Sequence, residues 1–326
     1  MNGSASFVGD VASYFLESAI LSLFLFLLVL LVIRICQIRN PMLRRHLWGL
    51  GVVYPVVAPL IYHIVLPWWG WTPGAKLLES GLARPIHWVS HHPTAFLPTL
   101  AILLGSLFGL DVLRWLLCWL RADARKDGAC AAMHHAQPCR SLLKPMAERL
   151  GLDRLPRVVL LDSAYVNVYS LPWSQPGIYL SANLAQLLDT EELRAMLAHE
   201  AAHLKHRDWI GLLVCQLCRD LMFFNPIIHL AYAGFLQAVE ESADDLAVSV
   251  TRDSLALAAC LIKVQTLMGR TGLMAGIGVG FVHWPTNLAR RVARLLRDEA
   301  AQPCPRSHMR VGWGVAGIAI VLAGVL

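Results

Sequence analysis

Charged residues are scarce in this chain. Asp, Glu, Lys and Arg make up 15% of the 326 residues, whereas an ordinary soluble domain has about 25%. Hydrophobic residues make up 56%, and the mean hydropathy is +0.53. This composition excludes an ordinary soluble globular protein, and the length is sufficient for two structural units. We therefore expect a membrane protein that also carries a folded domain.

A closely spaced cysteine framework is also absent, which excludes a small secreted fold held together by disulfides. Several cysteines lie inside apolar runs, and we expect them to be reduced and structural. The eight are Cys36, Cys118, Cys130, Cys139, Cys215, Cys218, Cys260 and Cys304.

The net charge of +6 does not indicate nucleic-acid binding. The basic residues cluster beside apolar runs and do not alternate with aromatic residues on a soluble face. We expect no direct nucleic-acid partner, and we interpret the basic residues as determinants of orientation in a lipid bilayer.

Long apolar runs predict the domain organisation, because a helix of about 20 apolar residues crosses a bilayer. We predict an N-terminal membrane region over 1–121, with three spans at about 11–35, 47–69 and 94–120. The first run is too long for a signal-peptide core and lacks a positively charged start. We predict a folded domain over 122–305 and a fourth span within 306–326, where 311–326 would form about 24 Å of helix.

The distribution of arginine predicts the orientation. The loop 34–46 carries four arginines and no acid, and further basic residues follow the third span, whereas the loop 67–93 carries two basic residues and one acid. Because cytoplasmic loops are enriched in Lys and Arg, we expect the N-terminus outside and the domain 122–305 in the cytoplasm.

Patterns in the central region predict a mainly helical α+β domain with a small sheet. Short strands are predicted at 157–162, 165–170 and 177–181, and Asp189 with Glu192 forms a capping box that begins a helix. The run 209–235 predicts a helical hairpin in or beside the membrane. The strand 165–170 could hold a substrate through its edge, with Asn167 bonding the substrate backbone, or could simply be part of the sheet core.

The segment "LAHEAAHLKHRD", residues 197–208, predicts a metal site. On a helix, His199 and His203 lie on one face with about 5–6 Å between their Cβ atoms, so both imidazoles could bind one zinc ion. Glu200 could then reach a zinc-bound water and act as general base. Because this five-residue pattern also arises by chance, a third ligand is needed.

A carboxylate is the expected third ligand, since two histidines and one carboxylate leave a fourth position open for water. Glu240 fits this role, and Asp244, one turn later, would orient a ligand histidine. Glu241 is a rival, because Glu241 and Asp245 have the same spacing.

Two further residues near the motif are expected to support the site. His206 lies seven residues after His199 and faces the same side. It could be taken for a third histidine ligand, but the glycine turn that precedes such a ligand in other zinc peptidases is missing. We expect His206 to act behind the ligands or at the helix end, and Asp208 to fix the helix end through local hydrogen bonds.

The segments "HEAAHLKHRD", "NPIIH" and "EESADDLA" together resemble the membrane metallopeptidases of the beta-lactam sensor and antirepressor family. A more distant similarity is to the heat-shock and prenyl-protein-processing membrane proteases. The resemblance covers roughly residues 140–300 and implies an α-helical membrane protein with a gluzincin-type zinc peptidase domain. It also implies a bacterial-type inner membrane, with the domain facing the cytoplasm and cleaving a protein.

The resemblance also implies roles for particular residues. His199, His203 and Glu240 match the family's ligands and Glu200 its base, and the spacing from Asn225 favours Glu240 over Glu241. The chain ends at Leu326, without the large extracellular sensing domain of the drug-sensor members, so penicillin sensing is not expected.

The segment "HWPTNLARRVARLL" is similar to the heat-shock relatives, in which a His-Pro pair and an arginine lie near the active site. Here Trp284 interrupts the pair. His283 and Arg291 are candidates for stabilising the tetrahedral intermediate. The alternative is an interfacial loop followed by a basic amphipathic helix on anionic lipid.

The sequence therefore predicts an integral-membrane endopeptidase with one Zn²⁺ per chain. The resemblance implies regulatory cleavage of a cytoplasmic or membrane-associated protein, with a transcriptional repressor as one candidate partner. The alternatives are a quality-control protease acting on misfolded membrane proteins, and a receptor or scaffold without catalysis.

Overall fold

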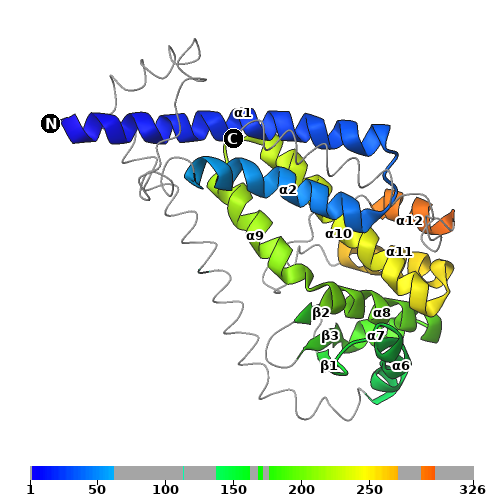
Figure 1. Ribbon diagram of the computed structural model, residues 1–326. Helices are drawn as coiled ribbons and strands as arrows, with labels where there is room; N and C mark the ends of the chain where they lie inside the picture. The colour runs from blue at the N-terminus through cyan, green and yellow to red at the C-terminus, as the bar shows by residue number, and fades with distance from the viewer. Residues whose placement is uncertain are drawn as a thin grey trace.

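The computed structural model describes residues 2–61, 113, 137–161, 168–171, 176–270 and 288–297. These residues form helices and one small sheet (Figure 1). Most of the third expected span, the whole fourth span, Asn167 and His283 lie outside the described residues.

Helices α1 (Asn2–Ile35) and α2 (Pro41–Leu60) form a hairpin at the N-terminus. Asn40 caps α2 by accepting hydrogen bonds from the backbone N–H groups of Met42 and Leu43, and Pro41 occupies the first turn, where a missing N–H costs nothing. The helix therefore begins six residues before the expected start at 47. Arg44 and Arg45, expected in a loop, lie near its beginning.

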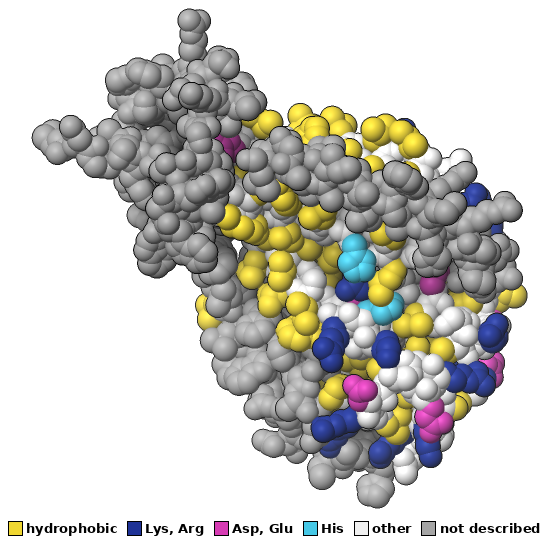
Figure 2. Space-filling view, in the orientation of Figure 1, with side chains coloured by type: hydrophobic (Ala, Val, Ile, Leu, Met, Phe, Trp, Pro, Cys, Tyr) yellow, Lys and Arg dark blue, Asp and Glu magenta, His cyan; other side chains and the backbone are white. Residues whose placement is uncertain are grey.

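Helix α1 contains the one described segment, Tyr14–Ile35, that is long and apolar enough to cross a membrane. Its two faces differ. One face is buried against the rest of the fold and includes Ser18, Ser22, Leu25 and Val29. The opposite face exposes large apolar side chains at helical spacing: Ile20, Leu23, Phe24, Leu27 and Leu31. Apolar side chains gather over the upper part of the described surface in Figure 2, and charged side chains over the lower part.

The sheet contains three strands in the order β1-β3-β2. They are β1 (Arg157–Leu161), β2 (Val168–Leu171) and β3 (Gly177–Ser181). β1 runs parallel to β3, and β2 runs antiparallel to β3 and forms an edge of the described sheet. Strands are therefore present at the three expected places, and residues 165–167 of the second expected strand lie outside the described residues. Helices α6 (Gln137–Arg149) and α7 (Ala182–Leu187) lie beside the sheet (Figure 1).

Five helices complete the described fold. They are α8 (Thr190–His206), α9 (Asp208–Leu221), α10 (Pro226–Thr251), α11 (Ser254–Arg270) and α12 (Leu288–Leu296). α9 and α10 form the expected helical hairpin. The side chain of Asn225 accepts a hydrogen bond from the N–H of Ile227 at the start of α10, and Pro226 occupies the first position of the helix.

The described residues form two hydrophobic cores that meet along α10. One core joins the sheet with α6, α8 and α11 and includes Ala247 and Val248 near the end of α10. The other joins α1, α2 and α9 and includes Ile228 and Phe235 near the start of α10. Residues 240–245 lie between these two sets. The acidic part of α10 is therefore positioned where α1, α2 and α9 meet the sheet-bearing part.

Candidate metal centre

Helix α8 carries both histidines of the motif at the meeting point of the two cores. Its start is fixed by the expected capping box, since Glu192 N–H donates to Asp189 and the Asp189 N–H donates to Glu192. The helix ends at His206, where Arg207 adopts a left-handed conformation with φ of 53°. His199 is buried, and His203 is mostly buried.

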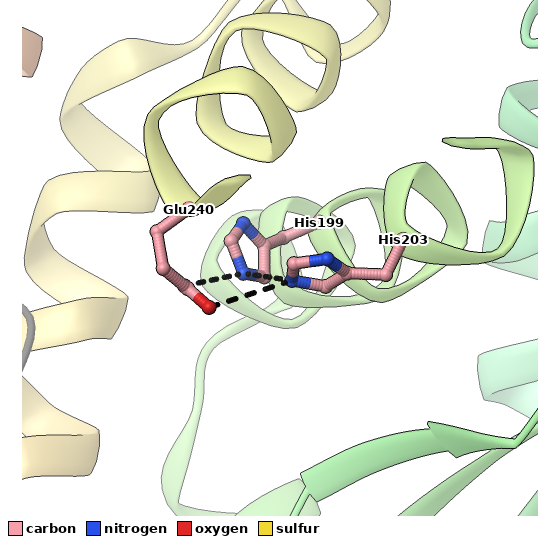
Figure 3. A group of neighbouring side chains, drawn as sticks. All are labelled: His199, His203 and Glu240. Atoms are coloured by element: carbon pink, nitrogen blue, oxygen red, sulfur yellow. Dashed lines mark hydrogen bonds and ion pairs between the residues drawn. The ribbon is translucent and has the colours of Figure 1, made fainter. Parts of the chain in front are cut away.

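The imidazoles of His199 and His203 converge on the carboxylate of Glu240 from α10 (Figure 3). The two Nε2 atoms are 3.1 Å apart. The Glu240 oxygens lie 3.6 Å from Nε2 of His199 and 4.0 Å from Nε2 of His203. A tetrahedral zinc ion with bonds of about 2.1 Å would separate its ligand atoms by about 3.4 Å. The three side chains therefore fit a small cation with nitrogen and oxygen ligands.

The second nitrogen of each imidazole faces a carboxylate. Nδ1 of His203 is 2.6 Å from Oδ2 of Asp208, and Nδ1 of His199 is 3.1 Å from Oδ1 of Asp244. A carboxylate at Nδ1 places the proton there and leaves Nε2 as the metal-binding atom. Asp244 and Asp208 therefore each contact one histidine of the group. Asp208, for which the sequence suggested a role in fixing the helix end, reaches His203 because the chain reverses at Arg207.

The electrostatics of the group favour a positive charge between the side chains. Burial opposes protonation of His199, but the interactions with Asp244 and Glu240 outweigh it and raise its pKa to about 10. Burial also disfavours the charged form of Glu240, but Arg291 and the two histidines hold its pKa well below the ordinary value. Burial likewise disfavours the charged form of Asp244, but the interactions with Arg291 and His199 outweigh it and lower the pKa of Asp244 to about 2. The carboxylates are therefore charged and ready to bind a cation.

Arg291 of α12 is buried next to this group. Its Nε and Nη2 donate to the two oxygens of Asp244 at 2.8 and 2.7 Å, and Nη1 is 2.8 Å from Oε2 of Glu240. This side chain is 4% exposed, so it is not on the lipid-facing surface that an amphipathic interfacial helix would present. Its described contacts hold the acids of the site in place, whereas the sequence suggested contact with the reacting substrate.

Glu240 and Glu241 point to different neighbours, which separates the two rivals for the third ligand. The carboxylate of Glu241 is 2.8 Å from Arg44 and 3.0 Å from Arg290, and it accepts a hydrogen bond from Gln237 at 2.9 Å. The only group of possible metal ligands found among the described residues contains Glu240 with the two histidines. The geometry therefore favours Glu240.

The remaining candidates are placed as follows. Glu200 is buried beside His199 on α8, and none of the described side chains forms an ion pair or hydrogen bond with its carboxylate. His206 is partly buried at the end of α8, and it is not part of the ligand group. Burial, together with the nearby positive charge of Arg45, outweighs the attraction of Asp208 and lowers the pKa of His206. Asn167 and His283 lie outside the described residues.

Sequence reasoning missed the two arginines of α2 that reach this region. Arg45 Nη1 pairs with Asp208, and Arg44 Nη1 pairs with Glu241. The one feature of the sequence that could have indicated them is the Asn40-Pro41 pair, which is typical of a helix start. A helix that begins there contains both arginines. Their partners are more than 160 residues away in the sequence, so no local pattern could have identified them.

Two histidines of the HExxH segment and a glutamate of a second helix thus converge as a set of groups that could hold a metal ion. The chain belongs to the family described as BlaR1 peptidase M56, which matches residues 13–295.

Several curated relatives are named as HtpX protease homologues. The one from Syntrophobacter fumaroxidans is 28% identical over 194 residues, which is 54% of this chain and 68% of the relative. Those from Sulfurisphaera tokodaii and Helicobacter acinonychis are 34% and 33% identical and cover 34% and 23% of this chain. In these two, the match spans 36% and 24% of the relative, well under two thirds of its length.

Proposed function

We propose that this chain is a zinc-dependent integral-membrane endopeptidase of the gluzincin type. The observation that carries the proposal is the convergence of His199, His203 and Glu240, with both Nδ1 atoms facing carboxylates. Membership of a peptidase family supports the reaction class. An HExxH glutamate also favours a catalytic site, because a purely structural zinc site has no use for a general base.

His199, His203 and Glu240 would hold the zinc ion. When bound, zinc polarises a peptide carbonyl and lowers the pKa of a water molecule at its open position. Glu200, next to a ligand and buried, would accept a proton from that water and donate it to the leaving amine. Asp208 and Asp244 would keep the imidazoles oriented, and Arg291 would hold Glu240 and Asp244 ionised.

The edge strand β2 is the proposed binding place for an extended substrate. β2 contacts α8, the helix that carries the histidines, and it lies at an edge of the described sheet. A peptide added to such an edge is held mainly through its backbone, which suits an enzyme that binds unfolded or looped segments. Asn167, just before β2, remains the candidate for a hydrogen bond to this backbone.

We propose a multi-pass membrane location with the site on the cytoplasmic side. The exposed apolar face of α1 supports insertion of this helix. The turn at 36–40 between α1 and α2 follows Arg34 and contains Arg39, and the arginines just beyond it contact residues of the site region. The metal centre therefore lies at the same end of the hairpin as the basic residues that the positive-inside rule places in the cytoplasm.

We propose regulatory cleavage of a cytoplasmic or membrane-associated protein as the biological role, with a transcriptional repressor as the candidate substrate. The match to the BlaR1 peptidase family supports this role. The alternative, quality control of membrane proteins, is supported by the similarity to HtpX protease homologues.

A comparison of cellular protein fragments with the native chain and with Glu200→Gln tests both the activity and the role. We expect Glu200→Gln to keep its zinc and to lose about 10²–10⁴-fold in rate, since it removes the general base. One or a few fragments that depend on Glu200 would support regulatory cleavage, and many fragments from unfolded membrane proteins would support quality control. Identical fragments with both proteins would leave the receptor or scaffold alternative.

A further inference from the structure

Helix α2 contacts the residues that support the metal centre, although it follows directly after the membrane-type helix α1. Nη1 of Arg45 pairs with Oδ1 of Asp208, and the other oxygen of Asp208 is 2.6 Å from Nδ1 of His203. The side chain of Asp208 is 2% exposed, so Asp208 depends on these two partners for its orientation. Arg45, Asp208 and His203 therefore form a continuous chain of contacts from α2 to a ligand histidine.

A second contact joins α2 to the ligand-bearing segment of α10. Nη1 of Arg44 donates to Oε2 of Glu241 at 2.8 Å, and Glu241 is nearly fully buried. Glu241 directly follows Glu240, so a force on its side chain acts on the backbone that carries the third ligand. Arg45 thus reaches Asp208, which contacts the ligand His203. Arg44 reaches Glu241, which is next in sequence to the ligand Glu240.

The close packing of α2 on α10 fixes the position from which these arginines reach out. A Cβ atom placed on Gly234 would lie 2.7 Å from the ring of Trp48, so the glycine permits a helix approach that any other residue would block. Trp48 is one helical turn after Arg44, and both belong to the α2 surface that contacts α10. The hairpin of α1 and α2 cannot shift along α10 without moving both arginines.

We propose that Arg45 is a positioning residue of the metal centre, which acts through Asp208 to hold His203 in its metal-binding orientation and thereby couples the α1–α2 hairpin to metal affinity. The inference rests on the proposed zinc function. The physical basis is that a carboxylate at the outer nitrogen of a ligand histidine fixes its tautomer and ring plane. A displacement of the hairpin that separates Arg45 from Asp208 therefore weakens metal binding.

The direction in which zinc affinity changes after removal of Arg45 distinguishes a positioning role from a direct charge effect on the metal. Loss of a positive charge near a Zn²⁺ site would by itself strengthen zinc binding, because like charges repel. Loss of orientation would weaken it, typically 10–100-fold for partners of metal ligands. Weaker zinc binding after removal of Arg45 therefore cannot be a direct charge effect on the zinc ion, and it points to lost orientation of His203 in a protein that remains folded.

The test measures the zinc dissociation constant by competition with a colorimetric chelator, using the full chain in detergent. We expect Arg45→Ala to weaken zinc binding about 10-fold or more and Arg45→Lys to restore part of the affinity. Arg39→Ala serves as the matched control, because Arg39 is an exposed arginine in the turn before α2, and should leave the affinity unchanged. Visible spectra of the cobalt-loaded proteins should change for Arg45→Ala and not for Arg39→Ala.

A double variant tests whether Arg45 acts through Asp208. If it does, the double variant of Arg45→Ala and Asp208→Asn binds zinc no more weakly than Asp208→Asn alone. If zinc affinity in the double variant fell by the product of the two factors measured in the single variants, the inference would be overturned. So would a lower unfolding temperature of Arg45→Ala with native zinc affinity and a native cobalt spectrum. Absence of zinc binding in the native chain would instead overturn the proposed function, and the inference with it.

Discussion

Replacement of Arg291 by methionine should strongly destabilise the metal-free protein. The guanidinium makes contacts at 2.7 and 2.8 Å with Asp244 and at 2.8 Å with Glu240, and it is 4% exposed. Methionine has a similar length and no charge, so the buried carboxylate of Asp244 and the mostly buried carboxylate of Glu240 would lose the guanidinium that contacts both. Breaking a buried ion pair in this way costs about 3–5 kcal/mol. For a domain of this size the unfolding temperature should fall by roughly 6–20 °C.

Zinc should offset part of this loss, because it supplies charge at the same carboxylates. The formal charge of Glu240, Asp244 and Arg291 together is −1 in the native chain and −2 in Arg291→Met. The added +2 of zinc brings these sums to +1 and 0. Arg291 also contacts Glu240 directly and so competes with a metal for one of its oxygens. We therefore expect zinc to raise the unfolding temperature more in Arg291→Met than in the native chain.

The assay is thermal unfolding followed by tryptophan fluorescence, in detergent, with either zinc or a chelator. Arg291→Lys is the matched variant, because it keeps the charge but loses the pair of hydrogen bonds to Asp244. Its unfolding temperature should lie between those of the native chain and Arg291→Met. A loss below about 1 kcal/mol without metal, as for an exposed pair, would show that Arg291 does not balance these carboxylates. An equal zinc effect in the native chain and in Arg291→Met would show that zinc and Arg291 do not act on the same charges.

Two further predictions concern the scaffold around the site. Gly234→Ala should destabilise the protein by about 1–3 kcal/mol, because the new methyl group would meet the ring of Trp48; unchanged thermal unfolding would contradict the close packing of α2 on α10. Arg207 adopts a left-handed conformation between α8 and α9, so Arg207→Val should lower the free energy of unfolding by about 1–2 kcal/mol whereas Arg207→Gly should be tolerated. Equal losses in the two Arg207 variants in chemical unfolding would show that backbone strain is not the cause.

Local patterns accounted for the elements that carry the ligands. The capping box at Asp189 predicted the start of α8, and both hydrogen bonds of the box are present. The four-residue spacing of His199 and His203 predicted their common face, and the Nε2 atoms lie 3.1 Å apart. These features follow from helix geometry alone, which depends on neighbours in the sequence.

Contacts between distant segments could not be predicted in the same way. The distance between Arg45 and Asp208 in the sequence is 163 residues, and the contact depends on how α2 packs on α9 and α10. Arg291 belongs to a segment with the basic amphipathic pattern of an interfacial helix, yet α12 turns this arginine inward onto two acids. A pattern of charges shows which face is polar but not whether that face meets lipid headgroups or buried carboxylates.

The start of α2 shows how one wrong boundary affects an interpretation. The sequence predicted a loop over 34–46 between two apolar runs, with four arginines in it, whereas Asn40 and Pro41 begin a helix that contains two of them. Arg44 and Arg45 are engaged with buried acids, so Arg34 and Arg39 are the basic residues left to interact with a membrane surface. The predicted orientation then depends on these two residues and on the basic residues after the third expected span.

We propose that His199, His203 and Glu240 bind one zinc ion, so the amount of metal bound per chain is the first quantity to measure. Zinc should be measured in the detergent-purified native protein, in Glu240→Ala and, as the matched control, in Glu241→Ala, whose carboxylate faces Arg44 and Arg290. We expect about one zinc per chain in the native protein and in Glu241→Ala, and a loss of zinc in Glu240→Ala. Folded native protein without zinc, or loss of zinc in Glu241→Ala alone, would contradict it.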